Sequence, residues 1–186
     1  MKRAFDLALA IVALPFAAVL ILACAIAIRL TSPGPAIFRQ VRIGRNEVPF
    51  TCLKLRTMRI STPDLPSHKV DVAAITPVGG FLRRSKLDEL PQLWNILKGE
   101  MSLVGPRPCL PTQVELIRAR RARGVAGLRP GITGVSQVAG VDMSDPERLA
   151  ALDATYLSDM SPGADLRLIL KTVAGSGRGD AAGRRA

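Results

Sequence analysis

The feature that most constrains the fold of this chain is an apolar segment near its N-terminus, residues 7–28, which contains no charged side chain. At about 1.5 Å per residue, a helix of this length reaches across a hydrocarbon core of roughly 30 Å. The simplest interpretation is a spanning helix. Pro15 argues against it, because proline removes a backbone hydrogen bond and bends a helix. Lys2 and Arg3 before the segment and Arg29 after it favour placing both ends on the cytoplasmic side.

A re-entrant membrane helix over residues 1–30 satisfies both observations. Such a helix enters one leaflet, breaks at Pro15 and returns, provided that the freed backbone groups find partners. A cleaved signal peptide is the third interpretation. It fits less well, because the apolar run continues past Cys24 to Ile28 and the charged stretch before it is very short.

Composition narrows the classes of partner and chemistry. The net charge is +11 and 48% of the residues are hydrophobic, which suits a protein on an anionic membrane surface that handles anionic substrates. One Trp, one Tyr and five Phe are few for stacking on bases, so no nucleic-acid partner is expected. Three widely spaced cysteines indicate neither a disulfide framework nor a zinc site. The single histidine, His68, lies in a polar loop, so catalysis must rest on carboxylates and cations.

The remaining patterns predict an α+β fold that is mostly helical, with a small cytoplasmic domain over residues 31–174 and amphipathic helices at the membrane interface. Residues 36–45 and 50–58 read as two short basic strands. Residues 113–123 form an arginine-rich surface helix, and a possible capping box opens another helix at Ser144. Residues 60–78 read as a loop over the site, and residues 175–186 as a flexible Gly- and Arg-rich tail. A last apolar stripe is expected in the core, although a short amphipathic helix on the bilayer would show the same pattern: Leu166, Ile169, Leu170 and Val173.

The most informative stretch is residues 83–108, with two adjacent acids, Asp88 and Glu89, near its centre. After them, Leu90, Leu93, Trp94 and Leu97 recur at helical spacing, and Pro91 is suited to the first helical position. The acids therefore lie at or just before a helix N-terminus, where unpaired amides and the positive end of the dipole meet. For an isolated helix, capping would explain them.

The neighbouring cations indicate more than capping. Arg83 precedes the acids, and Arg107 follows the helix in a Gly-Pro-Arg-Pro turn. Carboxylates between cations and a helix N-terminus can hold a phosphate with its metal ion. Lys54 and Arg56 are further candidates for binding phosphate, as is Arg129 in a glycine-rich turn over residues 128–134.

Residues 83–108 resemble the signature of the monotopic phosphoglycosyl transferases, bacterial enzymes that move a sugar phosphate from a nucleotide onto a polyprenol phosphate. The resemblance extends from Lys2 to about Val173, and further motifs at residues 38–40, 54–58 and 128–134 occur in the same order. Members of this family have a re-entrant helix, usually with Ser before the breaking proline. Here Leu14 takes that place.

The resemblance implies a UDP-sugar donor, with an N-acetylated amino sugar preferred, and a polyprenol phosphate acceptor such as undecaprenyl phosphate. It implies Asp88 as the nucleophile that releases UMP, Glu89 as the ligand of a required Mg²⁺, and Arg83, Arg107 and Arg129 as phosphate ligands. The expected location is the cytoplasmic face of the bacterial inner membrane. The expected role is the first membrane step of glycoconjugate, O-antigen or exopolysaccharide assembly.

Two other functions use the same features. A non-enzymatic, membrane-anchored basic protein could bind anionic lipid or nucleic acid, but it gives no reason for two acids among the cations. An enzyme that uses water as the acceptor would release UMP without polyprenol phosphate.

Overall fold

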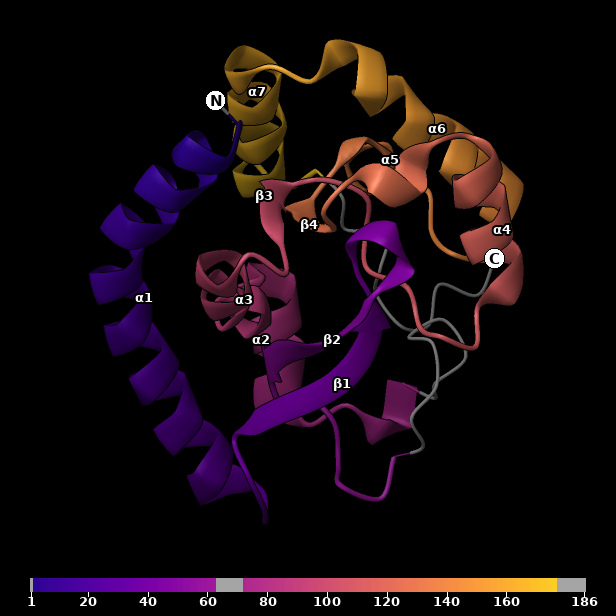
Figure 1. Ribbon diagram of the computed structural model, residues 1–186. Helices are drawn as coiled ribbons and strands as arrows, with labels where there is room; N and C mark the ends of the chain where they lie inside the picture. The colour runs from indigo at the N-terminus through magenta and orange to yellow at the C-terminus, as the bar shows by residue number, and fades with distance from the viewer. Residues whose placement is uncertain (1, 63–71, 177–186) are drawn as a thin grey trace.

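The computed structural model describes residues 2–62 and 72–176. Seven α-helices in these ranges pack around a two-stranded antiparallel sheet and a two-stranded parallel sheet, with the long helix α1 along one side (Figure 1). This is the expected mostly helical α+β fold. His68 and residues 177–186 of the predicted tail lie outside the described residues, as does part of the predicted loop.

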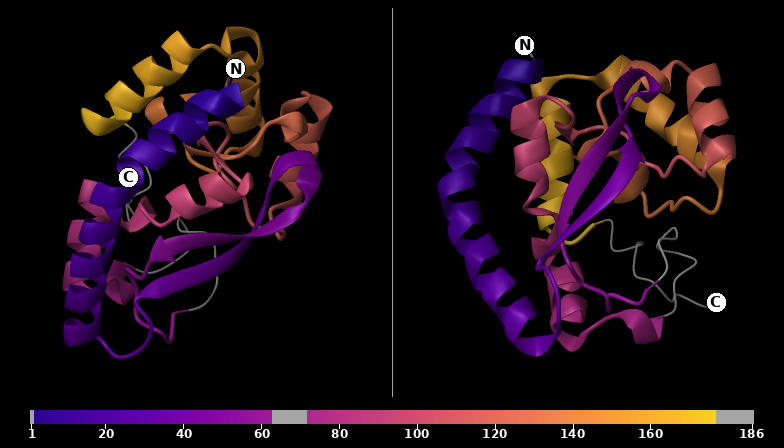
Figure 2. Two further views of the ribbon diagram at one scale, coloured as in Figure 1. Left: turned by 60° about the vertical axis from the view of Figure 1, so that its left-hand side comes forward. Right: turned by 60° about the horizontal axis from the view of Figure 1, so that its bottom comes forward.

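Helix α1 (Lys2–Thr31) is the one described helix long and apolar enough to cross a bilayer. It continues through Pro15, so the expected break is a bend rather than an interruption, and the two halves of the helix run in different directions (Figure 2). A proline within a helix is a sufficient cause of such a bend. The inner face is buried at Ala10 and Ala17, where small side chains allow close packing. The outer face exposes large apolar side chains: Ile11, Val12, Phe16, Val19, Leu22, Ile26 and Leu30.

The N-terminal end of α1 is fastened to the rest of the molecule by charged groups. Lys2 Nζ pairs with Asp165 Oδ2 at 2.7 Å, and the buried Asp6 accepts a hydrogen bond from Ser102 Oγ at 2.8 Å. Arg3 donates to the carbonyl oxygen of Ile96 at 2.6 Å. A charged group so deeply buried as Asp6 is tolerated because it has these partners.

The C-terminal end of α1 contacts the same body of the protein. Ile28 is buried in a cluster with Leu55 and Leu82. Both ends of the apolar helix therefore lie against the globular part that follows it.

Strands β1 (Ile37–Ile43) and β2 (Pro49–Leu55) form an antiparallel hairpin in which Phe38 pairs with Lys54. Between them, the short 3-10 segment η1 (Arg45–Glu47) makes the turn, with Asn46 in the left-handed region at φ 53°. The two basic strands predicted from the sequence are confirmed.

The chain then forms 3-10 segment η3 (Val72–Ala74), helix α2 (Pro77–Ser85), 3-10 turn η4 (Leu87–Glu89) and helix α3 (Gln92–Lys98). Thr76 caps α2 by accepting a hydrogen bond from the Gly79 amide. Pro91 is the N-cap residue of α3 rather than its first helical residue, one position from the prediction. Both acids precede this helix, as expected.

Strands β3 (Ser102–Val104) and β4 (Gly131–Thr133) pair in parallel. The segment between them contains α4 (Val114–Ala122) and the 3-10 segment η5 (Val125–Gly127), and α5 (Val135–Val138) follows β4. The predicted helix at 113–123 is confirmed, but Arg120 on it is buried.

Helices α6 (Pro146–Asp159) and α7 (Pro162–Val173) complete the fold. Asp145, not Ser144, caps α6, because its carboxylate accepts from the Arg148 amide at 3.1 Å. For most of the apolar stripe of α7 the core interpretation is wrong, because Leu166, Leu170 and Val173 are exposed. The alternative, an amphipathic helix on the bilayer, stays open. The residue that α7 buries is Asp165, because Lys2 and Tyr156 supply its partners.

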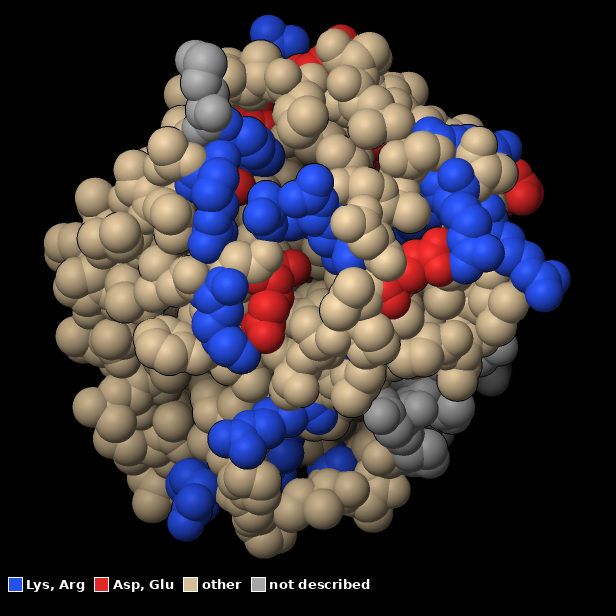
Figure 3. Space-filling model, in the orientation of Figure 1, with Lys and Arg blue, Asp and Glu red and all other residues tan. Residues whose placement is uncertain are grey.

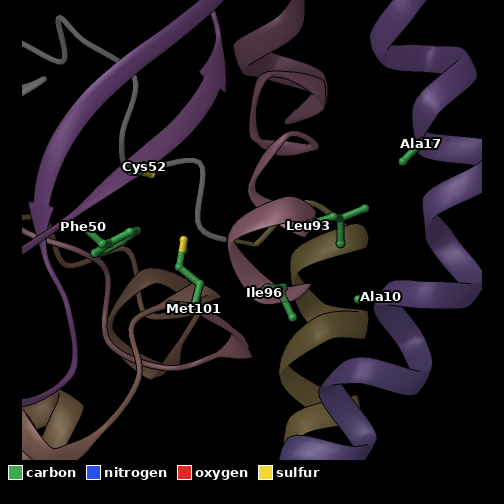
Figure 4. Packing of buried hydrophobic residues seen from close by; sticks show 7 residues of the cluster. All are labelled: Ala10, Ala17, Phe50, Cys52, Leu93, Ile96 and Met101. Carbon is green, nitrogen blue, oxygen red and sulfur yellow. The ribbon is translucent and has the colours of Figure 1, made fainter. Parts of the chain in front are cut away.

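The largest apolar cluster joins α1, the hairpin and α3. Ala10 and Ala17 face Leu93 and Ile96 of α3, and Met101 lies nearby; Phe50 and Cys52 of β2 complete the cluster (Figure 4). This packing fixes α3, which follows the two acids, between the apolar helix and the hairpin.

Candidate active site

The two acids lie in η4, directly after α2. Lys86 between them and α2 has φ 58°, a left-handed conformation that reverses the chain direction after the helix. Asp88 is buried, with 8% of its surface exposed, whereas Glu89 is partly exposed.

The environment of Asp88 favours a carboxylate of heightened basicity. Burial raises the pKa of Asp88 to about 6; Lys54 opposes this rise, Glu89 adds to it, and Arg83 and Arg107 oppose it. At pH 7 the group is therefore mostly ionised, although it is largely removed from water. A buried, charged oxygen surrounded by cations is suited to attack a phosphorus atom that itself carries negative charge.

Glu89 is held by cations on two sides. Lys54 Nζ lies 2.8 Å from Glu89 Oε1, and Arg107 Nη1 lies 3.7 Å from the same oxygen. The side chains of Lys54 and Arg107 are each 21% exposed, so both can still reach a bound ligand. An anionic substrate would find two cations and a carboxylate within one small region.

A buried amide places Lys54 beside Glu89. Asn95 of α3 is fully buried; its side chain donates to the Thr51 carbonyl at 2.8 Å and accepts from the Leu53 amide at 3.1 Å. These bonds fasten β2 to α3 in one register, so the residue after Leu53 lies beside the acids. Asn95 was not predicted as a site residue, although the sequence places it on the same predicted helix as Leu93 and Trp94, directly after the two acids.

Arg83 reaches the site from α2, where its Nε donates to Thr57 Oγ1 at 2.9 Å. The helix comes this close because Gly79 has no side chain: a Cβ there would meet the Thr57 carbonyl oxygen at 2.0 Å. Arg83 thus lies within electrostatic range of Asp88.

Arg107 is presented by a turn that packs backbone to backbone against the β4 region. A Cβ on Gly105 would lie 2.2 Å from the Arg129 carbonyl oxygen, and one on Gly131 would lie 2.1 Å from the Gly105 amide nitrogen. Prolines on both sides of Arg107 restrict the backbone further. The guanidinium therefore comes from a rigid support.

The hydrogen bonds of the other two predicted cations lead away from the acids. Arg56 is buried and donates to the carbonyls of Pro35 and Ser32 at 2.7 and 3.1 Å, which orders the turn after α1. Arg129 donates to the Gly99 carbonyl at 2.9 Å, at the opposite end of α3 from the acids. Burial and the nearby Arg45 and Arg3 lower the pKa of Arg129. Their roles as phosphate ligands stay predictions.

The donor set of the site fits Mg²⁺. This ion takes oxygen ligands, commonly one or two carboxylates with the remainder from water and substrate phosphates. Asp88 and Glu89 supply adjacent carboxylates, and within residues 2–62 and 72–176 no group of three or more His, Cys, Asp or Glu is gathered that would suggest a metal held by protein alone.

A buried carboxylate with a second acid and several cations is the arrangement that transfer of a charged phosphoryl group requires. On the face seen in Figure 3, Lys and Arg cover more of the surface than Asp and Glu. The site is therefore suited to an enzyme that acts on phosphate-containing substrates.

Comparison with known proteins identifies the family of this chain. Residues 1–178 match the family model described as bacterial sugar transferase, and the chain belongs to this family. The expectation of an enzyme, a phosphoglycosyl transferase, is confirmed.

Several relatives resemble the chain over most of its length. It is 42% identical over 182 residues to the UDP-glucose:undecaprenyl-phosphate glucose-1-phosphate transferase of Caulobacter vibrioides, covering 92% of this chain and 68% of that one. It is 39% identical over 173 residues to the uncharacterized sugar transferase EpsL of Bacillus subtilis, covering 93% and 85%. An Aeromonas hydrophila UDP-N-acetylgalactosamine-undecaprenyl-phosphate N-acetylgalactosaminephosphotransferase is 35% identical over 184 residues, covering 92% and 42%.

Proposed function

We propose that this protein transfers a sugar-1-phosphate from a UDP-sugar to undecaprenyl phosphate or a similar polyprenol phosphate, through a covalent intermediate on Asp88. The observation that carries the proposal is the buried Asp88 carboxylate, with a pKa of about 6, among Lys54, Arg83 and Arg107. The Caulobacter and Aeromonas relatives, whose names state this donor and acceptor class, support it.

In the first half-reaction, a carboxylate oxygen of Asp88 attacks the phosphorus that bears the sugar. A bond from this oxygen to phosphorus forms as the bond from phosphorus to the bridging oxygen breaks, and UMP leaves with that oxygen and its electron pair. Arg107 and Lys54 stabilise the charge on the phosphoryl oxygens as the transition state forms.

In the second half-reaction, a phosphate oxygen of the polyprenol phosphate attacks the same phosphorus. The bond to Asp88 breaks, which regenerates the carboxylate and gives polyprenyl diphosphate sugar. Because burial keeps water scarce around Asp88, transfer to the lipid is favoured over hydrolysis.

Glu89 would hold Mg²⁺, next in the chain to the nucleophile Asp88. When bound, the ion neutralises charge on the diphosphate and its leaving group. Lys54 and Arg107, both close to Glu89 Oε1, keep this carboxylate oriented toward the substrate-binding region.

We also propose that α1 is a re-entrant membrane helix and that catalysis takes place at the cytoplasmic face of the bacterial inner membrane. The support is that both ends of α1 contact the same globular body, through Asp6 at one end and Ile28 at the other. The side of the molecule formed by α1 is largely free of charge along its length in Figure 3. The exposed stripe on α7 extends the apolar surface available to the interface.

The sugar is proposed to be an N-acetylated amino sugar, for which the Aeromonas relative is the support. Glucose is the competing donor, since the Caulobacter relative is named for it. A pathway role in assembling a surface or exported polysaccharide fits a relative named as an exopolysaccharide production protein.

The test is to trap the intermediate. Purified protein in detergent micelles is incubated with Mg²⁺ and a panel of UDP-sugars without lipid, and intact-protein and peptide mass spectrometry locate the adduct. We expect one sugar phosphate on Asp88 and an equal amount of UMP, with Asp88→Asn giving neither. Glu89→Gln should form the adduct slowly, still on Asp88.

Four results would contradict the proposal. An adduct on Glu89 would exchange the two roles, and UMP release that requires lipid and leaves no adduct would indicate direct transfer. Sustained UMP release without polyprenol phosphate would identify water as the acceptor. Absence of UMP release with every donor would instead favour a non-enzymatic membrane protein.

A further inference from the structure

The backbone of the turn that presents Arg107 is held by donors from several separate segments. The Pro106 carbonyl accepts from the Gly131 amide at 2.9 Å, and the Pro108 carbonyl accepts from Arg42 Nη1 at 3.0 Å. The carbonyl of Arg107 itself accepts from Arg120 Nη1 at 2.8 Å.

Arg120 is the unusual donor in this set, because it is a charged side chain on α4 that is only 7% exposed. Its Nε and Nη2 both donate to Asp153 Oδ2 on α6, at 2.9 and 2.7 Å. Asp153 is 2% exposed, and its other oxygen accepts from Ser136 Oγ of α5 at 2.7 Å. Arg120, Asp153 and Ser136 are therefore all buried.

A buried ion pair alone is weak evidence of stabilisation, since removing two charges from water costs about as much as their attraction returns. Here the pair also fixes the direction of the guanidinium. Two of its nitrogens are bound to one carboxylate oxygen, so the third, Nη1, can point only along a narrow range of directions. It points at the Arg107 carbonyl.

We propose that Arg120 is a positioning residue for transfer, which acts by fixing the Arg107 backbone and so the guanidinium beside Glu89, with Asp153 and Ser136 orienting Arg120. This inference rests on the proposed function, because it assigns Arg120 a role only through Arg107. A displacement of about 1 Å at a catalytic group can lower a rate by about 100-fold, so a fixed carbonyl has kinetic consequences.

The alternative is that Arg120 and Asp153 only join α4 to α6. The two roles differ in one measurable respect. If Arg120 acts through Arg107, its substitution loses its effect once the Arg107 side chain is gone, whereas a purely structural contribution adds to that of Arg107.

The experiment is a double-mutant cycle on kcat/KM for UMP release, with single-turnover conditions for the slow variants. Arg120→Lys, which keeps a positive charge for Asp153 but loses the planar fork, should lower kcat/KM by about 10- to 100-fold in the wild-type background. In the Arg107→Ala background it should change kcat/KM by less than about threefold.

Two further variants distinguish a loss of positioning from a loss of folding stability. Ser136→Ala removes one hydrogen bond to Asp153 and should cause a smaller loss of a few fold, again absent when Arg107 is Ala. Tyr156→Phe is the matched control: it removes a buried hydrogen bond to Asp165 from the same helix, α6, without touching the turn. It should leave kcat/KM unchanged even where it lowers the melting temperature.

Equal losses in both backgrounds, or a kcat/KM loss in Tyr156→Phe as large as in Arg120→Lys at equal destabilisation, would overturn the positioning role. So would a fully active Arg120→Lys. These outcomes leave the proposed function intact, because wild-type protein still releases UMP. Lack of UMP release by wild type would instead reject the function itself.

Discussion

Asp88→Asn is expected to abolish transfer and, at the same time, to make the protein more stable at neutral and alkaline pH. The reason is that burial raises the pKa of Asp88 from an ordinary value of 3.8 to about 6. The folded state therefore binds a proton at this site more tightly than the unfolded state does. The ionised carboxylate needed for attack is the form that the folded protein accommodates less well.

The sign follows from proton linkage. Below pH 3.8 both states are protonated at this group and it has no effect on stability. Between pH 3.8 and 6 the unfolded state loses its proton first, so the free energy of unfolding falls as the pH rises. Above pH 6 the loss is complete, at about 3 kcal/mol for a rise of this size.

Asparagine resembles the protonated carboxyl and does not ionise, so the variant lacks this loss. For a domain of this size, about 3 kcal/mol corresponds to a melting temperature roughly 6 to 12 °C higher at pH 8. The difference between variant and wild type should shrink to near zero by pH 4. Thermal unfolding in detergent micelles, followed by circular dichroism at several pH values, measures it.

Asp159→Asn, at an exposed position at the end of α6, is the matched control and should show no difference of this kind. An Asp88→Asn protein no more stable than wild type at pH 8 would refute the reasoning. A gap that is the same at pH 4 and pH 8 would also do so, because it would not arise from ionisation.

Two further predictions concern the electrostatics of Asp88 and the membrane topology of α1. The rate of adduct formation should fall below about pH 6, as Asp88 becomes protonated. Lys54→Met should move the midpoint of this pH profile upward, because Lys54 is the cation that most strongly opposes the raised pKa of Asp88. An unchanged midpoint would show that Lys54 does not act on the pKa of Asp88. For the topology of α1, single cysteines are introduced separately at positions 2 and 29 in a chain without its native cysteines. Both should be protected from an impermeant thiol reagent added to intact spheroplasts, and both should react after lysis. Labelling of only one of them in intact spheroplasts would show that α1 spans the membrane.

Local patterns in the sequence were sufficient for several features of this protein. The length and uniform apolarity of residues 7–28 predicted a long helix, and Pro15 its bend, because both are properties of one continuous segment and need no contact from elsewhere in the chain. The strands of the hairpin, and the acids before a helix beginning near Pro91, were predicted for the same reason. The family motifs added the proposed roles of Asp88 and Glu89, which no local rule supplies.

Long-range contacts decided which side chains lie together in the site. Lys54 meets Glu89 because Asn95 fastens β2 to α3, a contact between segments far apart in the chain. Arg129, which a sequence motif predicts as a phosphate ligand, donates to a carbonyl at the other end of α3. Its role as a phosphate ligand stays a prediction.

The same limit explains the two helices whose faces were misjudged. Periodicity shows which side of a helix is apolar, but not whether another element covers that side. On α7 the apolar stripe is left exposed and Asp165 is buried, since Lys2 arrives from the opposite end of the chain to pair with it. On α4 an arginine-rich face was expected to be solvated, yet Arg120 is buried. Asp153 pairs with its positive charge, and the Arg107 carbonyl accepts its remaining hydrogen bond. Only the tertiary structure brings those oxygens within reach.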